Sequence, residues 1–578
     1  MSMRKADPVT VEVVRNLLMS IADETNTVII KSAFSTNIKE RRDNTTAIMD
    51  PEGNVVVQVE SSLPALLAAL LYGARSVRKQ YKLEDIHPGD MFIVNDPYNG
   101  GGNHMPDISV ICPTFANGKL IGWVGNTAHH SDIGGKIPGS TSGDADSTFQ
   151  EGIRIPVIKI CRDGEINDDV MRLLLNNTRT PVERKGDLTA QISANLIGSQ
   201  KLQAAYDKYQ DTLLDCMQEM LGYTERLMKA AIAKIPDGTY SYVDYVDGCG
   251  ERYPDPININ VAVQVKGENM TIDFTGTHPE VEAPINVPYP MLVGCVLFCM
   301  KALVNPDMPT NWGIVKPIEI IAPKGCLCNP TEPHAVGLTI DAAQRLPDAI
   351  FGALNPILPK RALAASNGAC TSAIFFGRNK GQGDGEDQYF IFHESIAGGA
   401  GASHIHDGLS GVQVYLTNTS NMPIEATETE FPAVRLKTYK LRTDSCGAGK
   451  HRGGCGIIRE YQVTCDNVAC NCFGDRQRFA PWGMEGGLDG EPGGFWHISA
   501  ETGEVTRLSA KTTGFPLKKN DIIRVYTPGA GGVGNPAERA PELVLADVVA
   551  RKISCEAAER IYGVRVRATK NGSYELAE

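Results

Sequence analysis

The sequence has no long apolar run and no cluster of basic residues. Its two most apolar stretches, 63–71 and 291–304, are too short or too interrupted to span a bilayer. The first residues contain no apolar core, so we expect no secretory signal. The 578 residues carry a formal net charge of −12, which argues against a general nucleic-acid binder. We therefore expect a cytoplasmic protein that binds neither nucleic acid nor membrane.

The sequence also lacks any Cys-x-x-Cys pair, although it contains 15 cysteines. Zinc ribbons and thioredoxin-like redox motifs use that pair, so neither is supported. Two Cys-x-Cys pairs do occur, Cys326 with Cys328 and Cys470 with Cys472. We expect reduced and mostly buried thiols, as is typical of a cytoplasmic protein. A site that joins the two pairs is an alternative without support.

No phosphate-binding loop of the Gly-x-x-x-x-Gly-Lys-Ser/Thr kind occurs, and no Gly-x-Ser-x-Gly nucleophile elbow. One Gly-x-Gly-x-x-Gly pattern is present at 529–534, after an apolar strand pattern at 521–526. A dinucleotide fingerprint leads directly into a helix, whereas Asn535-Pro536 follows here. We interpret this segment as a turn-forming loop, so the chain has no recognisable site for ATP of its own.

Histidine is scarce, with 11 in the whole chain, yet three of them fall within residues 104–130. The segments Gly-Gly-Asn-His-Met-Pro-Asp at 101–107 and Asn-Thr-Ala-His-His-Ser-Asp at 126–132 also supply aspartates. Imidazole and carboxylate groups on glycine-rich loops are typical ligands of an open divalent-metal site. A site with few protein ligands leaves positions for water or substrate, so the pattern favours a catalytic metal centre.

The positions of these residues suggest how a site would be built. His104 and Asp107 lie on either side of a proline, which excludes a regular helix and indicates a rigid loop. His129 ends a predicted strand, and two such strands side by side would bring both loops to one sheet edge. Asp43, an isolated acid that begins another strand, is a candidate fourth ligand. The alternative, in which His129 and His130 are buried, hydrogen-bonded histidines and Asp107 caps a turn, stays open.

Adjacent histidines on an extended backbone point in opposite directions, so only one of His129 and His130 can face a given site. We predict His129 as the ligand and place His130 beside the ligands or facing substrate. His130 and Asp132 are then candidates for proton transfer. His404 and His406 form a candidate second metal site in another glycine-rich loop, although a polar loop that contacts substrate or a partner is the favoured interpretation.

The N-terminal region contains clear helix and strand patterns. A helix is predicted over 8–32, with Asp7 as its cap and Pro8 at its first position. A hairpin is predicted over 46–59 and a buried helix over 62–79. Further predictions are a strand at 89–97, a strand pair at 108–114 and 120–126 that turns at Asn117-Gly118, and a mobile polar loop at 140–152.

The remaining sequence favours an α+β, multidomain fold with large mixed or antiparallel sheets. Residues 188–235 read as nearly continuous helix apart from Gly222, and strand patterns follow with interleaved helices. The C-terminal half is β-rich and dense in glycine, and a closing helix is predicted over 548–562. We divide the chain into a metal-site α+β domain (1–235), a mixed α/β domain (236–365) and a β-rich domain with the closing helix (366–578).

Short motifs occur in a characteristic order along nearly the full chain. They lie at 7–15, 40–44, 89–98, 104–108, 129–135, 138–140, 151–156, 273–277, 453–456, 475–476 and 562–564. Examples are Glu-Arg-Arg-Asp-Asn at 40–44 and His-Met-Pro-Asp-Ile at 104–108. In these motifs the sequence resembles the hydantoinase B/oxoprolinase family.

The resemblance implies a B-type subunit of an ATP-dependent enzyme that opens a cyclic amide, such as a hydantoin, an oxoproline or a lactam. An A-type partner subunit would bind ATP with Mg and activate the substrate, which agrees with the missing phosphate loop. The motif match implies that a divalent metal, Zn, Mn or Fe, is held by Asp43, His104, Asp107 and His129. It also implies a hetero-oligomer, such as a dimer of heterodimers.

Two other functions are compatible with the same resemblance. Related subunits serve ATP-dependent ketone carboxylases, in which bicarbonate is a further candidate ligand. A non-catalytic scaffold that completes the partner's site is the other alternative. For each of these functions we expect 398–408 and 527–535 to line the substrate site. The sequence does not specify which cyclic amide or ketone is the substrate.

Overall fold

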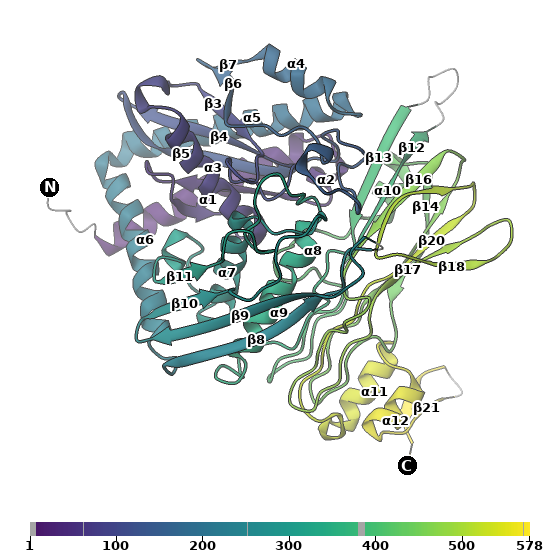
Figure 1. Cartoon of the computed structure of the whole chain (residues 1–578). Coiled ribbons are helices and arrows are strands. Elements are labelled where there is room, and N and C mark those ends of the chain that lie inside the picture. Colours follow the sequence, from purple (N-terminus) through teal and green to yellow (C-terminus); the bar gives the residue numbers. More distant parts are fainter. Residues whose placement is uncertain (1–6, 62, 251, 380–387, 570–571, 578) are drawn as a thin grey trace. The chain divides into compact units, whose positions relative to one another are not determined.

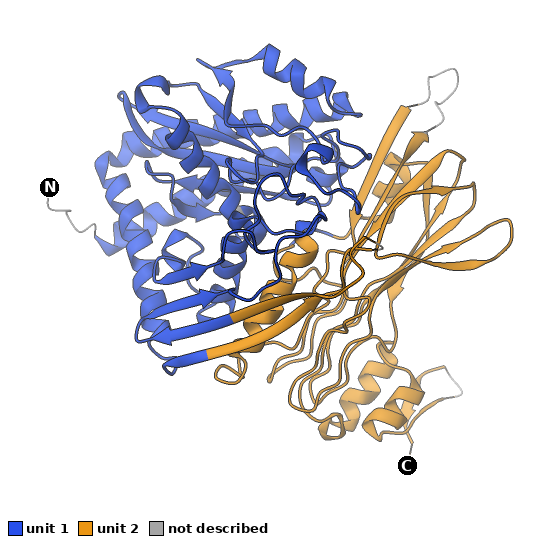
Figure 2. Ribbon diagram, viewed as in Figure 1, with its two compact units in different colours: residues 1–239, 262–339, 418–420 blue, residues 240–261, 340–417, 421–578 orange. Residues whose placement is uncertain are grey.

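The computed structural model describes residues 7–61, 63–250, 252–379, 388–569 and 572–577, which form the predicted α+β fold with several separate sheets (Figure 1). Two compact units are each assembled from more than one segment (Figure 2). The first break, between Thr239 and Tyr240, lies near the predicted boundary at 235, and the three-domain division itself stays a prediction. Unit 1 comprises 1–239, 262–339 and 418–420, and unit 2 comprises 240–261, 340–417 and 421–578.

Unit 1 is built on a seven-stranded antiparallel sheet in the order β2-β1-β5-β4-β3-β6-β7. Strands β4 and β5 form its central hairpin and turn at Asn117-Gly118, as predicted, where both residues have positive φ. The strands are β1 (Asn44–Met49), β2 (Val55–Gln58), β3 (Met91–Val94), β4 (Asp107–Ala116), β5 (Lys119–His129), β6 (Ile158–Arg162) and β7 (Glu165–Ile166).

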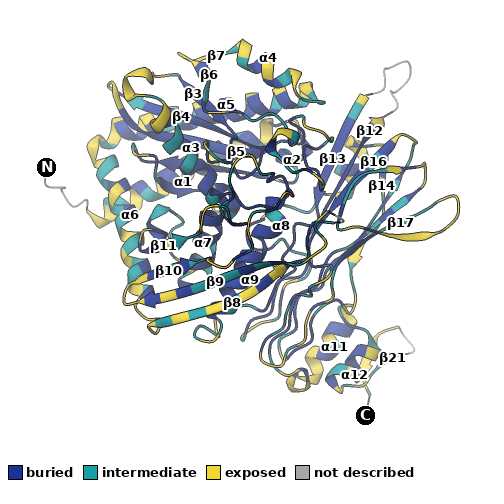
Figure 3. Ribbon diagram, in the orientation of Figure 1, coloured by how far each residue is buried: buried dark blue, intermediate teal, exposed yellow. Residues whose placement is uncertain are grey.

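Helices cover both faces of this sheet. Val124 of β5 lies against Gly198 of α5, whereas the next residue, Gly125, lies against Leu70 of α3. Because successive strand residues face opposite sides of a sheet, α5 and α3 lie on opposite faces. Strands β4 and β5 are accordingly buried along nearly their whole length (Figure 3). The helices of unit 1 are α1 (Pro8–Ser32), α2 (Thr36–Lys39), α3 (Pro64–Gln80), α4 (Asp168–Asn176), α5 (Pro181–Tyr209), α6 (Asp211–Ile232) and α7 (Tyr289–Val304).

The first helix begins and ends where the sequence predicts. The Asp7 carboxylate accepts the Thr10 amide (3.0 Å) and caps the helix, and Pro8 occupies its first position. Val14, Leu18 and Ile21 are buried on its inner side, where α1 packs against α5 and α6. This amphipathic face fixes α1 to the sheet through tertiary packing.

The long helical region breaks at Gln210 and not at Gly222, so that prediction is wrong. Gly222 lies inside α6, where the buried face of the helix outweighs the cost of about 1 kcal/mol for an interior glycine. Gln210 separates α5 from α6 with φ 51° and ψ −141°, a conformation that favours glycine. The closing helix predicted over 548–562 is also interrupted: it contains the end of α11 (Pro541–Val549) and all of α12 (Cys555–Tyr562).

The segment 140–152 differs from the predicted mobile polar loop. Ser140, Ser142, Thr148 and Glu151 are buried, and the segment contains a short 3₁₀ helix, Thr148–Gln150. Several of its polar groups are hydrogen-bonded within unit 1, for example from the Ser140 hydroxyl to the Gly134 carbonyl (2.9 Å). Polar composition alone therefore does not indicate how deeply this segment is buried.

Unit 2 contains two antiparallel sheets that share one hydrophobic core. Their orders are β13-β12-β16-β19 and β14-β15-β20-β17-β18, and side chains such as Phe375, Phe392, Tyr461 and Val525 fill the core. The strands are β12 (Ser372–Asn379), β13 (Gln388–Ser395), β14 (Val434–Leu441), β15 (Ile457–Val463), β16 (Val468–Phe473), β17 (Gly494–Ile498), β18 (Val505–Leu508), β19 (Lys511–Leu517) and β20 (Ile522–Tyr526).

The remaining elements are shorter. A four-stranded sheet in the order β11-β10-β9-β8 contributes residues to both units. A small hairpin, β21 with β22, packs beside the last two helices. These elements are β8 (Gly238–Val246), β9 (Ile257–Lys266), β10 (Asn269–Asp273), β11 (Ile318–Ile321), α8 (Thr339–Ala343), α9 (Arg345–Leu354), α10 (Ile424–Glu430), β21 (Val566–Ala568) and β22 (Tyr574–Leu576).

The dense glycines of unit 2 allow loop backbones to pack directly on one another. A Cβ on Gly529 would lie 1.8 Å from the Ser445 carbonyl oxygen, and one on Gly453 would lie 2.0 Å from that of Ala530. No larger residue fits such spacings. The 529–534 pattern is followed by a short 3₁₀ helix, Pro536–Glu538, and backbone packing accounts for its glycines.

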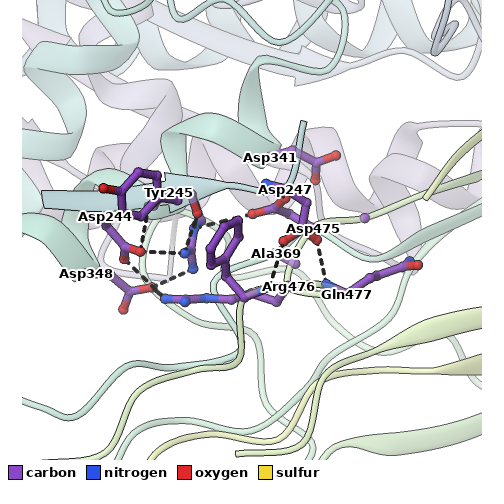
Figure 4. A network of polar contacts seen from close by, with 12 residues as sticks. Asp244, Tyr245, Asp247, Asp341, Asp348, Ala369, Asp475, Arg476 and Gln477 are labelled. Atoms are coloured by element: carbon purple, nitrogen blue, oxygen red, sulfur yellow. Dashed lines mark hydrogen bonds and ion pairs between the residues drawn. The ribbon is translucent and has the colours of Figure 1, made fainter. Parts of the chain in front are cut away.

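Unit 2 also encloses a network of buried charges (Figure 4). Arg345 pairs with Asp244 (2.7 Å) and Asp475 (3.3 Å), and Arg476 pairs with Asp348. Burial raises the pKa of Asp348 to about 8, although Arg345 opposes this shift. Because the charges are paired with one another, they tie β8, α9 and the 475–476 segment together inside the unit.

The cysteines match the prediction of mostly buried thiols. In the described residues none of the 15 forms a disulfide, and 12 of them are buried. Among the residues that the structure describes, no helix has both the length and the apolar character needed to cross a bilayer.

We predict that Gln210→Gly stabilises the protein by about 1 kcal/mol, because glycine removes the backbone strain at this position. Gln203→Gly is the matched control, since Gln203 is an exposed residue inside α5. There the same change should destabilise by about 1 kcal/mol. Denaturant unfolding measures both, and equal effects of the two changes would contradict the prediction.

Candidate metal centre

The ends of the neighbouring strands β4, β5 and β1 bring the predicted ligands side by side. Asp107, the first residue of β4, pairs in register with His129, the last residue of β5. The His129 amide donates to the carbonyl of Asp43 (3.0 Å), which immediately precedes β1. The expectation that neighbouring strands bring both loops to one sheet edge is therefore confirmed.

His104, Asp107 and His129 form a compact buried cluster. Their ligand-type atoms all lie within 4.8 Å of one another, and no other such group of His, Cys, Asp or Glu is found among the described residues. His104 Nε2 is 3.3 Å from Asp107 Oδ1, and the two imidazole rings have centroids 5.0 Å apart. The cluster brings two nitrogen donors and a carboxylate together in a space that water reaches poorly.

The backbone orients the His104 ring. Its Nδ1 lies 3.0 Å from the carbonyl oxygen of Gly337. A carbonyl oxygen only accepts, so Nδ1 carries a proton and Nε2 faces Asp107. Burial lowers the pKa of His104, but Asp107, the Gly337 carbonyl and Asp43 together raise it by more, so the net pKa shift is upward.

His129 has a different electrostatic environment. Burial, with a further contribution from His104, holds the pKa of His129 well below its usual range. The ring is therefore neutral, which is the form that binds a metal. Asn37 lies beside it, with Nδ2 3.1 Å from His129 Nδ1. Sequence reasoning missed Asn37 and the Gly337 carbonyl, because neither belongs to a recognisable ligand pattern.

Asp43 lies next to the cluster but is paired with another residue. Its carboxylate contacts Arg41 Nη2 at 2.6 Å, and both side chains are buried. Burial raises the pKa of Asp43, although Arg41 and His104 lower it. Asp43 is outside the compact group of three, so its role as fourth ligand stays a prediction.

His130 and Asp132 are held by other partners. His130 Nε2 is 2.9 Å from Gln191 Oε1 on α5, the helix on the opposite face from α3. Burial, with Arg184, lowers the pKa of His130 to about 4, so the ring is neutral. Asp132 is fully buried and accepts from Arg179 Nη1 (2.9 Å). These contacts do not bring either residue to the cluster, and their proposed role in proton transfer stays a prediction.

The second histidine pair is not part of a metal-type cluster in the described residues. His404 Nε2 contacts Glu485 Oε2 (2.7 Å), and His406 Nδ1 contacts the Ser403 hydroxyl (2.8 Å). The geometry agrees with the favoured interpretation of this segment as a polar loop.

The residues present fit a divalent metal. Two imidazoles and one carboxylate are the usual protein ligands of zinc sites that keep an open position, and Mn and Fe accept the same donors. Asn103 lies beside Asp107 and has a buried Oδ1 without a hydrogen-bond partner. An unsatisfied buried acceptor next to the cluster is consistent with a ligand that the protein atoms alone do not supply.

The fold and the cluster together define an α+β protein with a candidate buried divalent-metal centre at the edge of an antiparallel sheet. Residues 7–536 match the family model of hydantoinase B/oxoprolinase. The chain belongs to this family.

Two relatives match along nearly their full length. An uncharacterized protein of Methanocaldococcus jannaschii is 38% identical over 565 residues, covering 97% of this chain and 96% of the relative. The putative D-/L-hydantoinase B-type subunit of Pseudomonas sp. is 33% identical over 589 residues, covering 99% and 98%. In contrast, the chain spans only 42% of the 5-oxoprolinase 1 of Arabidopsis thaliana, at 30% identity.

Solved structures show the same fold. The ATP-dependent caprolactamase from Pseudomonas jessenii superposes with a TM-score of 0.90 at 28% identity, covering 99% of this chain and 98% of that one. An acetone carboxylase structure gives a TM-score of 0.89 at 19% identity, covering 100% and 82%, and shows the fold alone.

We predict that replacing His104, Asp107 or His129 with alanine removes bound metal, since each change deletes one donor of a three-donor cluster. Elemental analysis of the purified chain measures this. His87→Ala is the matched control, because His87 is an exposed histidine of the same unit. Unchanged metal content in the His104 and Asp107 variants would show that the ligand assignment is wrong.

Proposed function

We propose that this chain is the metal-binding subunit of an ATP-dependent enzyme that opens a cyclic amide. The buried His104–Asp107–His129 cluster carries the proposal, because its donors fit a metal and its position is fixed by strand pairing. Membership of a family whose relatives include a putative hydantoinase subunit and 5-oxoprolinases supports the substrate class. Hydantoin, oxoproline and lactam rings are the candidate substrates.

We propose that His104, Asp107 and His129 hold the metal, with Asp43 as the fourth ligand once its carboxylate turns from Arg41. A divalent metal in this position supplies Lewis acidity, which polarises a carbonyl and lowers the pKa of water. His104 presents Nε2 because Nδ1 is bonded to Gly337, and His129 is neutral because it is buried. Zn, Mn and Fe all suit this donor set.

The activating step is assigned to a partner. Unstrained amides resist hydrolysis, so coupling to ATP has a physical reason, and the sequence has no phosphate-binding loop of its own. The Pseudomonas sp. relative, which is named as one subunit of a hydantoinase, and the relatives more than twice as long both support a division of the activity between two parts. We propose an A-type subunit that binds ATP with Mg in a cytoplasmic hetero-oligomer, such as a dimer of heterodimers.

We predict that the co-purified complex with the A-type subunit opens hydantoin, 5-oxoproline or caprolactam with release of ADP. Chromatography of the open-chain product and an ADP assay measure the coupling. His104→Ala in the complex should abolish ring opening, whereas His87→Ala should not. The isolated chain is the control for contributions from the partner.

Two results would change the assignment. Incorporation of labelled bicarbonate into a ketone, without ring opening, would identify a carboxylase subunit, for which the shared fold of acetone carboxylase is the supporting observation. Full ATP-dependent turnover by a metal-free His104 variant would instead identify a scaffold that completes the partner's site.

We predict that Asp132→Asn lowers the stability of the chain by about 3 kcal/mol, because it removes the buried negative charge that pairs with Arg179. Metal content should stay unchanged, since Asp132 does not contact the cluster. Denaturant unfolding and elemental analysis measure the two effects. A variant that is fully stable but has lost turnover in the complex would show that Asp132 transfers protons.

A further inference from the structure

A segment distant in sequence lies against the metal centre. Residues 333–337 contact the loop that carries His104, through the bond from His104 Nδ1 to the Gly337 carbonyl. Ala335, Val336 and Gly337 are buried. The orientation of His104 therefore depends on how this segment is held.

Glu151 holds the segment through its backbone amides. The carboxylate accepts the N–H of Val336 at 3.0 Å and also the N–H of Gly337. Glu151 is 1% exposed, so these amides replace the water that would otherwise solvate the charge. A Cβ on Gly337 would lie 2.7 Å from Glu151 Oε1, so the carboxylate fits against a position that has no side chain.

Neighbouring backbone bonds keep Glu151 and this segment in register. The Thr148 amide donates to the Pro333 carbonyl (2.9 Å), and the Ala335 amide donates to the Asp146 carbonyl (3.2 Å). On the other side of Gly337, the Leu338 amide donates to the Pro284 carbonyl (2.8 Å). The peptides on both sides of Gly337 are thus fixed, although glycine itself is conformationally free.

We propose that Glu151 is a positioning residue for the metal ligand His104. The carboxylate fixes the Val336–Gly337 peptide, the Gly337 carbonyl then fixes the proton on His104 Nδ1, and Nε2 is left to face Asp107. The expected effect of Glu151 on metal affinity rests on the proposed function. Its structural step, the orientation of His104, is independent of the metal.

The first test examines that orientation in the metal-free chain. Histidine-labelled protein is studied by NMR at about pH 8, where Glu151 is ionised because burial raises its pKa to about 7. We expect a hydrogen-bonded, slowly exchanging Nδ1 proton on His104, assigned by its absence in His104→Ala. Glu151→Gln loses the charge and places an amide nitrogen where the second carboxylate oxygen accepts the Val336 N–H (3.0 Å), so this proton should exchange faster. An unchanged His104 signal would overturn the proposal.

The second test measures Co²⁺ affinity by titration of the full chain. Loss of a residue that orients a ligand from behind typically weakens binding about 10- to 100-fold, and we expect this range for Glu151→Gln. Asp90→Asn is the matched control: Asp90 is also a buried carboxylate that accepts a backbone amide, that of His87 (2.8 Å), and it does not contact the 333–337 segment. It should destabilise the fold without changing Co²⁺ affinity.

A double-mutant cycle distinguishes positioning from general support of the fold. Gly337→Ala should weaken Co²⁺ binding, because its Cβ collides with Glu151. In the Glu151→Ala background the collision is absent, so the further loss should be small. Additive losses would overturn the proposal.

The outcomes separate the two proposals. If the wild-type chain binds no Co²⁺ but its His104 proton responds to Glu151→Gln, the proposed function fails and the positioning role stands. If the wild type binds Co²⁺ and the folded Glu151 variants bind it equally well, the positioning role fails and the metal centre stands.

Discussion

The antiparallel register between β4 and β5 is the constraint on which the candidate site depends. It sets Asp107 opposite His129, and the pairing of β5 with β1 brings Asp43 alongside. A slip of one residue would exchange His129 for His130 and turn every neighbouring side chain to the other face. Helices α3 and α5 prevent that slip, because each helix packs on one face of the sheet and so contacts only every second side chain of a strand. The hydrophobic core of unit 1 thus determines which histidine faces Asp107.

Burial gives the two histidines of the cluster different properties. His129, next to another imidazole and away from water, is held neutral, whereas His104 gains basicity from Asp107. Their tautomers are constrained by groups behind the rings, Asn37 and the Gly337 carbonyl. The same burial keeps Asp43 paired with Arg41, because an unpaired carboxylate there would be costly.

Sequence periodicity was enough to predict what depends on local order. The capped helix at 8–32, the Asn117-Gly118 hairpin and the α+β class all follow from patterns shorter than one element. Because side chains alternate along an extended strand, only one of His129 and His130 can face the site. The pairing of β5 with β4 shows which of the two lies opposite Asp107. The break at Gln210 could not be predicted, because nothing in a glutamine signals positive φ. The Gly337 carbonyl could not be predicted either, since a backbone group from a distant segment has no sequence signature.

The segment 140–152 shows why polar composition misled at the site itself. A polar segment is expected at the surface, because burying unpaired polar groups is unfavourable. The rule fails where most buried polar groups find partners, and such arrangements concentrate where a protein must hold a geometry. Glu151 is buried against backbone amides that only an acceptor satisfies, and those amides belong to the segment that contacts His104. A polar stretch between a ligand loop and a sheet is therefore better interpreted as the support of a site than as a mobile surface loop.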